Sequence, residues 1–277
     1  MCRAGAIRIC LYWLIFWTGK TGGVFLKKRR KKMNNRIMSH MVAYYPDEEK
    51  SFTVARALID GGCSYLEVQF PFSDPSADGV LIQRACRTAL EAGFRADGGF
   101  ELISKIRKYS DVPVFIMSYA NLVFFRGVEK FLRDCAETGV SGVIVPDLPP
   151  DSDEGLYSYG KRLNVKAVPV IMPNIEDKRL NMIIKHTEEY LYTAIRVGIT
   201  GKFTKIDSSV LEFLKKVQGM GVKILAGFGI SERSQVEAVL HFVHAAVVGS
   251  AFIKVIEQNG ERNDPYDAVL KKIKELV

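Results

Sequence analysis

Cysteine and histidine are scarce in this sequence, and neither forms a metal-binding pattern. The 277 residues include five cysteines and four histidines. The cysteines are scattered, with no C-x-x-C pair, and no cysteine lies at zinc-ligand spacing from a histidine. The sequence therefore predicts no metal site and no disulfide framework. Reduced, mostly buried thiols are typical of a cytoplasmic protein, which is the location we expect.

Signatures of several enzyme classes are also missing. No G-x-G-x-x-G follows the first predicted strand, and no G-x-x-x-x-G-K-[ST] loop is present, so neither dinucleotide binding nor a nucleotide P-loop is indicated. No G-x-S-x-G elbow appears, and the four histidines form no triad. We expect His40, on the first predicted strand, to be a core residue with its hydrogen bonds satisfied.

The first 36 residues lack aspartate and glutamate but contain ten lysines and arginines. The whole chain has 39 basic and 31 acidic residues, so the remainder holds 29 basic against 31 acidic residues, a net charge of −2. The overall charge of +8 is therefore local. It gives no reason to expect nucleic-acid binding by the rest of the chain.

Long apolar runs are missing from this first segment. Residues 9–17, ICLYWLIFW, are too few to span a bilayer as a helix. They suit a signal-peptide core, but no A-x-A cleavage site follows. Residues 1–36 could be an untrimmed upstream translation with the native start near Met33 or Met38, a membrane-associated leader or a disordered tail. We favour the first, because the segment lacks the periodic order that follows it, and we expect no membrane contact of residues 1–32.

What the remaining chain does contain is a repeated alternation of apolar runs and amphipathic stretches. Helical spacing appears in Phe52, Ala55 and Leu58 before a Gly-Gly pair, and again in the last helix, for which Asp264 is the expected cap. The apolar runs are nearly continuous, as in strands buried on both faces. They are residues 37–45, 65–70, 112–119, 142–146, 166–172, 190–195, 222–228 and 245–250.

Eight strand-then-helix units predict an α/β fold, a (β/α)8 TIM barrel of parallel strands with outer helices, over residues 37–277. A doubly wound open sheet is the structural alternative. In a barrel, active-site residues lie at the carboxyl ends of the strands and in the loops that follow them.

Three acids lie in one stretch, EVQFPFSDPSADG at residues 67–79. Glu67 lies inside an apolar strand, where an acid is costly unless paired or used. It either makes a structural hydrogen bond to a neighbouring strand, or has a raised pKa and exchanges protons near neutral pH. Asp74 could form an Asx turn or contact a partner. Asp78 could act chemically or cap the next helix.

Polar and small residues gather at the same end of the predicted barrel. Asp147 follows the fourth strand, and Tyr119 and Asn121 close the third, with helix capping as the alternative role for Asn121. Glycine clusters follow the last three strands, in RVGITGK, GFGIS and GSA. Backbone N–H groups at such loops and at helix N-termini bind anions, so the clusters predict a phosphate site.

Several of these segments together resemble the alpha subunit family of tryptophan synthase. They are LEVQFPFSDPSADGVLIQ, SYANLVFFRGVEKFL, IVPDLP, RVGITG, GFGIS and VVGSAFIKVIEQ. The likeness runs in one order from about residue 37 to residue 276, and the first segment is long and specific.

The resemblance implies a lyase of tryptophan biosynthesis. It would cleave indole-3-glycerol phosphate to indole and glyceraldehyde 3-phosphate by retro-aldol chemistry, with no metal or cofactor in this chain. By resemblance, Glu67 would protonate the ring carbon that bears the side chain and relay the proton of the glycerol hydroxyl. Asp78 would lie beside the indole N–H and stabilise the positive charge that develops there.

The resemblance also implies a set of substrate-binding residues. Tyr192 matches a tyrosine that lines the glycerol portion of the substrate. Thr200 belongs to a loop, residues 196–201, that closes over the ligand and contacts Asp78. The other substrate-binding residues implied, most of them phosphate-binding backbone, are Gly201, Phe228, Gly229, Gly249 and Ser250.

A partner is implied as well. In this family the alpha subunit binds a pyridoxal-phosphate beta subunit in an α2β2 heterotetramer and passes indole to it through a tunnel. The pyridoxal phosphate belongs to the partner, so none is expected in this chain. The residues that match the interface side are Pro71, Asp74, Tyr119 and Asn121.

The sequence departs from the family pattern at four places. AYYPDEE replaces a Gly-Asp-Pro turn after the first strand, Gln69-Phe70 stands where a small residue is usual, and Pro146 replaces a small residue before Asp147. A helix ahead of the first strand has no counterpart. Three other functions stay open: a stand-alone indole-3-glycerol phosphate lyase, a mainly allosteric partner subunit with weak catalysis, and a barrel acting on another sugar phosphate.

Overall fold

The computed structural model describes residues 36–195 and 208–277. The predicted N-terminal extension and the predicted loop with Thr200 and Gly201 therefore lie outside the described residues. Within the described ranges, no helix is both long and apolar enough to cross a bilayer. In the same ranges, Cys63, Cys86 and Cys135 are buried and none of them forms a disulfide with another.

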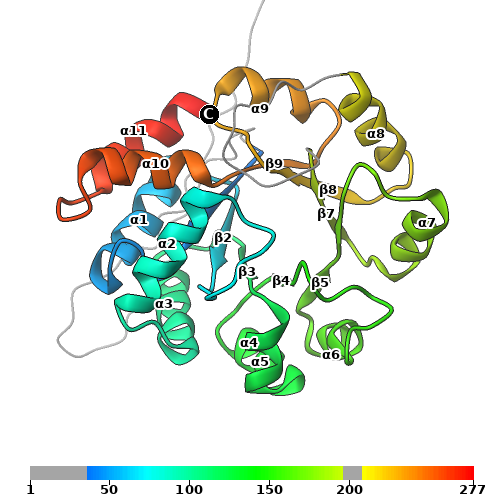
Figure 1. The fold of residues 1–277 in the computed structure, drawn as a ribbon, viewed down its shortest axis with the longest axis horizontal. Helices are drawn as coiled ribbons and strands as arrows, with labels where there is room; N and C mark the ends of the chain where they lie inside the picture. Colours follow the sequence, from blue (N-terminus) through cyan, green and yellow to red (C-terminus); the bar gives the residue numbers. More distant parts are fainter. Residues whose placement is uncertain (1–35, 196–207) are drawn as a thin grey trace, which may run out of the picture.

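Parallel strands form the centre of the molecule (Figure 1). The strands are β1 (Ile37–Val42), β2 (Tyr65–Gln69), β3 (Val114–Met117), β4 (Gly142–Ile144), β5 (Lys166–Val168), β6 (Val170–Ile171), β7 (Tyr190–Ala194), β8 (Lys223–Gly227) and β9 (Ala245–Val248). Their order in the sheet is β5-β4-β3-β2-β1-β9-β8-β7-β6. The two ends of this order, β5 and β6, are separated by a single residue, Pro169.

One run of chain, residues 166–171, thus pairs with β4 through its first half and with β7 through its second half. The strand predicted over residues 166–172 is interrupted because Pro169 has no N–H to donate to the sheet. Its carbonyl still accepts a hydrogen bond from Tyr192 N–H at 2.9 Å. The run closes the sheet on itself, so the predicted TIM barrel is confirmed and the open-sheet alternative is wrong.

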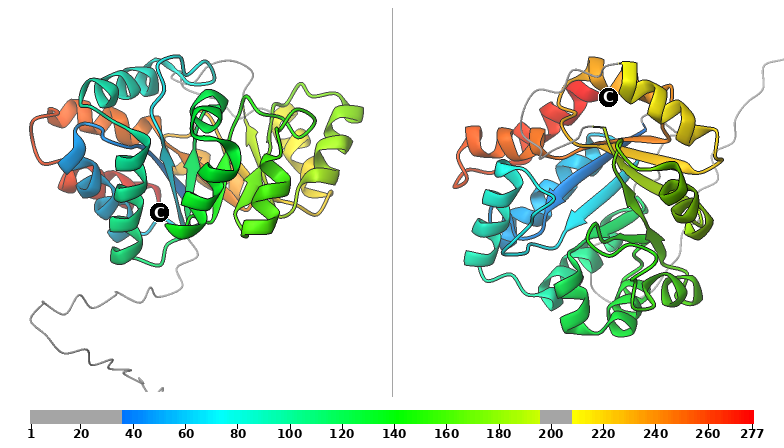
Figure 2. Two further views of the ribbon diagram at one scale, coloured as in Figure 1. Left: turned by 90° about the horizontal axis from the view of Figure 1, so that it is seen from below. Right: turned by 45° about the vertical axis from the view of Figure 1, so that its right-hand side comes forward.

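Helices surround the strands on the outside (Figures 1 and 2). They are α1 (Glu48–Asp60), α2 (Val80–Glu91), α3 (Ala96–Tyr109), α4 (Ala120–Arg126), α5 (Val128–Glu137), α6 (Leu156–Leu163), α7 (Asp177–His186), α8 (Ser208–Gln218), α9 (Arg233–Leu240), α10 (Ser250–Asn259) and α11 (Tyr266–Leu276). The first ends at Gly61, as predicted. The last begins after Pro265, which is its N-cap, so the prediction of Asp264 as the cap is wrong by one position. Asp264 Oδ1 nevertheless accepts the N–H of Tyr266, the first residue of the helix, at 2.8 Å.

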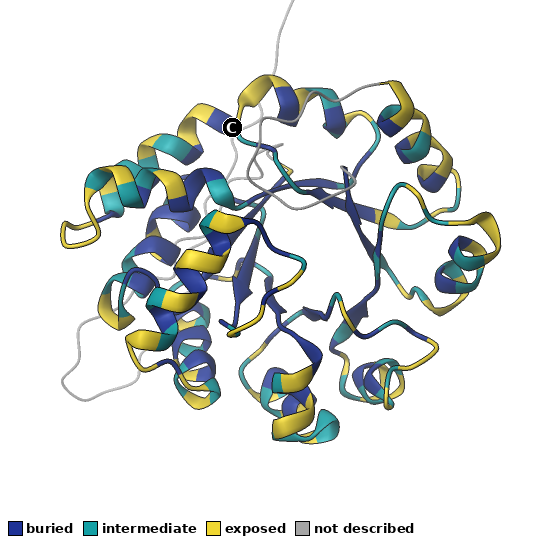
Figure 3. Ribbon diagram, viewed as in Figure 1, coloured by how far each residue is buried: buried dark blue, intermediate teal, exposed yellow. Residues whose placement is uncertain are grey.

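Buried side chains form two separate layers, and Figure 3 shows the buried faces turned toward the strands. The larger layer lies between strands and helices and includes Leu66 and Val68. The smaller one fills the barrel interior and includes Met38, Phe115 and Met117. Because successive strand residues face opposite sides, Glu67, between Leu66 and Val68, is directed into the interior. Strand alternation therefore explains how an acid comes to lie inside an apolar barrel.

Candidate active site

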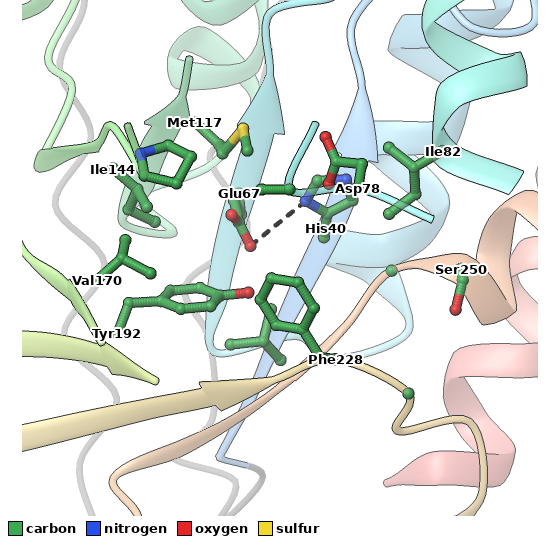
Figure 4. Close-up of a pocket in the computed structure, with 15 residues that line it drawn as sticks. His40, Glu67, Asp78, Ile82, Met117, Ile144, Val170, Tyr192, Phe228 and Ser250 are labelled. Atoms are coloured by element: carbon green, nitrogen blue, oxygen red, sulfur yellow. Dashed lines mark ion pairs between the residues drawn. The ribbon is translucent and has the colours of Figure 1, made fainter. Parts of the chain in front are cut away.

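A pocket with about 570 Å³ of empty space, its open mouth included, lies at one end of the barrel interior. Its walls come from strands β1, β2, β3, β4, β6, β7 and β9 and from the loops after β2, β4, β8 and β9 (Figure 4). These loops follow the carboxyl ends of the strands, which is where barrel active sites form. The lining residues are His40, Glu67, Ala77, Asp78, Ile82, Met117, Ile144, Pro146, Val170, Tyr192, Phe228, Gly229, Val247, Gly249 and Ser250.

Glu67 lies at the bottom of this pocket and is 1% exposed. In the parallel pairing of β1 with β2 it stands directly opposite His40. The two side chains meet, with His40 Nδ1 at 3.4 Å from Glu67 Oε2 (Figure 4). The contact with the neighbouring strand is an ion pair, and Glu67 Oε2 has no hydrogen-bond partner among the described residues, so the predicted structural hydrogen bond is not confirmed.

Asp78 enters the same pocket from the loop after β2 and is 4% exposed. Two donors reach one of its oxygens: Gln69 Nε2 at 2.7 Å and Tyr119 Oη at 2.9 Å from Oδ2. No side-chain donor among the described residues reaches Oδ1. Helix capping by Asp78, the alternative role, is wrong, because the N-cap of α2 is Gly79. The carboxylate is thus anchored on one side and free on the other.

Burial raises the pKa of Asp78, and nearby groups partly offset that effect. His40, Gln69 and Tyr119 lower the pKa, whereas the charge of Glu67 raises it further. Burial also raises the pKa of Tyr192 well above its ordinary value, so its hydroxyl stays protonated at neutral pH. The pocket therefore holds titratable groups whose proton affinities are displaced by their surroundings, as is typical of active sites.

Apolar side chains make up the remaining walls. Ile82, Met117, Ile144, Val170 and Val247 surround the acids. Figure 4 shows Ile82 on the side of Asp78, and Met117, Ile144 and Val170 on the other side of Glu67. Such a lining suits a flat apolar group whose one polar atom is bound by a carboxylate.

The far side of the pocket is formed by two loop-to-helix junctions. Phe228 and Gly229 follow β8 with φ of 80° and 93°. Gly249 is the N-cap of α10, and Ser250 is its first residue. An N-terminus of a helix at a pocket presents free N–H groups and a partial positive charge, which together attract an anion. Four of the residues predicted to bind substrate therefore lie in the pocket wall, as does Tyr192.

Two predicted residues have contacts that the sequence did not indicate. Tyr119 is only 1% exposed and its hydroxyl donates to Asp78, while its place at the partner interface stays a prediction. His40 is buried as predicted, at 5% exposure, but no described residue bonds its Nε2, so the prediction of satisfied hydrogen bonds is wrong.

The other predicted interface residues lie around the mouth of the barrel. Asp74 is exposed and Pro71 is buried in the loop after β2. Asn121 is exposed in the first turn of α4, whose N-cap is Tyr119, so the capping alternative for Asn121 is wrong. Asp147 accepts the first N–H of that helix, from Ala120 at 2.9 Å, and thereby has a structural role.

Sequence reasoning missed the roles of Gln69 and His40. Gln69 had been noted only as a departure from the family pattern, yet it donates to Asp78. Its position two residues after Glu67 places it on the same face of β2, so strand alternation alone could have indicated it. For His40 the available signal is a polar side chain within an apolar strand. The sequence alone predicts a core residue there and does not show that it faces Glu67.

The comparisons with known proteins agree with this geometry. The model of the family described as "Tryptophan synthase alpha chain" matches residues 26–276. The tryptophan synthase alpha chain of Helicobacter hepaticus is 38% identical over 230 residues, which cover 80% of this chain and 86% of that protein. That of Methanocaldococcus jannaschii is 33% identical over 243 residues, covering 86% of each. The solved tryptophan synthase A-subunit of Pyrococcus furiosus is 30% identical with a TM-score of 0.80, covering 87% of this chain and 97% of that one.

Proposed function

The chain belongs to the tryptophan synthase alpha chain family, and from this premise we propose that it cleaves indole-3-glycerol phosphate to indole and glyceraldehyde 3-phosphate. The observation that carries the proposal is the placement of Glu67 and Asp78 in one apolar pocket at the carboxyl end of the barrel. This arrangement offers a proton donor, an anion for a ring nitrogen and apolar walls for the ring itself.

Glu67 is proposed as the acid and base of the cleavage. It gives its proton to the indole carbon that bears the glycerol side chain, which places a positive charge on the ring nitrogen. The bond from that carbon to the side chain then breaks, and its electron pair returns to the ring and neutralises the nitrogen. The hydroxyl on the departing carbon becomes the aldehyde, and its proton returns to Glu67. One carboxyl can serve both steps, because the proton that it gives to the ring is replaced by the proton of the hydroxyl.

Asp78 is proposed to stabilise the positive charge that develops on the ring nitrogen. Gln69 and Tyr119 hold its Oδ2, which orients Oδ1 for the ring N–H. A fixed carboxylate in a pocket shielded from water acts strongly on a developing charge, because little reorganisation is needed when the charge appears. This role requires Asp78 to be ionised. Activity should therefore fall as the pH drops through its raised pKa.

The phosphate of the substrate is proposed to bind at the junctions after β8 and β9. Gly229 and the N-terminus of α10 line the pocket there, and Ser250 adds a hydroxyl. Tyr192 lies beside Glu67 in Figure 4, with its hydroxyl directed toward Phe228, and it is proposed to bind the glycerol portion. Thr200 and Gly201 remain part of the proposal by resemblance, outside the described residues.

A partner subunit is part of the proposal. A tryptophan synthase complex of Pyrococcus furiosus resembles this barrel with a TM-score of 0.78 and 28% identity over 87% of this chain and 97% of that one. By that likeness we propose a beta subunit partner, an α2β2 heterotetramer, and pyridoxal phosphate in the partner alone. Pro71, Asp74 and Asn121 are the proposed contact residues. A cytoplasmic location is proposed as well and is supported by the free thiols of the described cysteines.

The test is to supply indole-3-glycerol phosphate to the purified chain, with and without a beta subunit, and to quantify both products. The proposal expects indole and glyceraldehyde 3-phosphate in equal amounts, faster with the beta subunit. A rate unaffected by the beta subunit would favour the stand-alone lyase, and a very low rate in both cases would favour the allosteric subunit. Absence of indole with turnover of another sugar phosphate would contradict the proposal.

A further inference from the structure

His40 is a buried titratable residue for which the proposed reaction gives no role. It lies on β1, is 5% exposed, and faces the pocket interior together with Glu67. A histidine in this position has a cost, since its Nε2 is buried and bonds no described residue. The question is what its presence beside two acids does for the site.

Among the described residues, the charged and polar groups that act on the imidazole come from β2 and the loop after it. From β2 come the Glu67 carboxyl, at 3.4 Å from Nδ1, and the Gln69 amide; from the next loop comes Asp78. From the junction after β9 comes Gly249, which has no charge. The two acids thus share one nearby imidazole (Figure 4).

Gly249 fixes the ring in this place. A Cβ added to Gly249 would lie 2.8 Å from His40 Cδ2 and 3.0 Å from Cγ, closer than packed atoms approach. The glycine therefore allows the ring to lie against the N-terminus of α10 while its other side faces Glu67. Any residue other than glycine at this position would therefore displace the ring or the backbone.

The charge balance of the pocket favours a protonated imidazole. Burial lowers the pKa of His40, but the charges of Glu67 and Asp78 and hydrogen bonding outweigh burial, so the pKa is raised overall. In return, the charge of His40 lowers the pKa of Asp78. Two acids held in an apolar interior are mutually unfavourable, and one cation between them offsets that repulsion.

We propose that His40 is a positioning residue of this site: its imidazolium holds the Glu67 carboxyl and supplies the counter-charge that sets the pH range in which Glu67 and Asp78 work. The inference rests on the proposed lyase function. His40 acts through the acids, so its loss leaves substrate binding largely intact and changes the rate and its pH dependence.

The activity test compares His40→Gln and His40→Phe, which remove the charge but differ in shape, with the parent chain. Ser39→Ala is the control, because Ser39 is also buried on β1 but faces the opposite side of the strand. Without the cation Asp78 holds its proton more tightly, because the charge of His40 lowers its pKa. The acidic limb of the kcat/KM profile should therefore move to higher pH by about one pH unit in both His40 variants, with KM changed less than about threefold.

A second measurement does not depend on activity. The full chain is prepared with isotope-labelled histidine and titrated by NMR. Of the signals of its four histidines, the one that is missing in His40→Gln belongs to His40. In Glu67→Gln the midpoint of the His40 titration should move to lower pH by about one unit, because its anionic neighbour is gone.

The outcomes separate the two proposals. If the parent chain releases indole while the pH profiles of both His40 variants match it, the inference about His40 is wrong. A His40 titration that is unchanged in Glu67→Gln overturns it as well. If the parent chain releases no indole, the lyase function is wrong, and the titration still decides whether His40 and Glu67 form a charged pair.

Discussion

Individual side chains in this site take their roles from their neighbours in the fold. Tyr119 is the clearest case, since its hydroxyl donates to Asp78 Oδ2 at 2.9 Å and accepts from Ala77 N–H at 3.1 Å. It therefore links the loop that carries Asp78 to the start of α4. A residue that matches an interface by resemblance also holds the Asp78 carboxylate.

Substituting Tyr119→Phe tests that role. The change removes a donor that lowers the pKa of Asp78, so that pKa should rise. Since Asp78 must be ionised, the acidic limb of the kcat/KM profile should move to higher pH, and kcat near pH 6 should fall by about tenfold. The measurement is indole release against pH without a beta subunit.

Tyr65→Phe is the matched control, because the Tyr65 hydroxyl bonds His244 outside the pocket. It should leave the profile unchanged. If Tyr119→Phe leaves the profile unchanged but reduces the gain in rate from the beta subunit, Tyr119 serves the interface and does not tune Asp78.

The candidate acids could be predicted from the sequence, but their surroundings could not. Glu67 can be recognised as an acid between apolar strand residues. Asp78 belongs to the segment EVQFPFSDPSADG, which resembles the family specifically. The His40–Glu67 contact depends on the register between β1 and β2, which is fixed only when the barrel forms. The bond from Tyr119 to Asp78 joins residues 41 positions apart, and no local pattern indicates it.

At the scale of elements, the packing of α1 against α11 depends on Gly61. This C-cap residue of α1 has φ −73°, which alanine also adopts, so its requirement for glycine is steric. A Cβ here would lie 2.0 Å from Ile273 Cγ2, and Ile273 is fully buried in the layer between strands and helices. The two helices can approach as they do because the side chain is missing.

Gly61→Ala should therefore destabilise the chain by about 1–3 kcal/mol, as overpacking does. Ile273→Leu removes the branch at Cβ that causes the clash. The double variant should accordingly lose less stability than the sum of the two single variants, by about 1 kcal/mol. Denaturant unfolding of the four chains measures this. Strict additivity would show that the helices move apart and that the clash is not what fixes their spacing.

The element order was accessible from the sequence because buried parallel strands read as continuous apolar runs. All eight runs became strands, with shorter bounds. The sequence shows Pro169 but does not indicate that the strand breaks there. That residues 166–171 pair with β4 on one side and β7 on the other, and so close the barrel, can be known only from the strand pairing.

For the whole molecule, the described fold begins immediately before β1. Arg36 Nη1 donates to Val243 O at 3.0 Å, and Arg36 O accepts from Ala246 N–H. Ile37 is 1% exposed and its carbonyl accepts from Ser64 N–H at 2.7 Å. The barrel therefore uses these two residues to join β1 with β9 and with the start of β2.

Two shortened chains should consequently differ. A chain that starts at Met33 keeps Arg36 and Ile37 and should unfold at the temperature of the full chain. A chain that starts at Met38 loses a buried apolar side chain and several hydrogen bonds, and its free energy of unfolding should fall by about 3 kcal/mol. Thermal and denaturant unfolding check this. Equal stability of the two short chains would mean that the contacts of Arg36 and Ile37 contribute nothing.

The most direct test of the account is the rate of indole release by Glu67→Gln. Glu212→Gln is the matched control, because it makes the same change on the exposed face of α8. The account predicts a loss of kcat of about 10²–10⁴-fold or more for Glu67→Gln, with unfolding unchanged, and none for the control. A Glu67→Gln chain that is folded and fully active would contradict the central claim that this carboxyl transfers the proton.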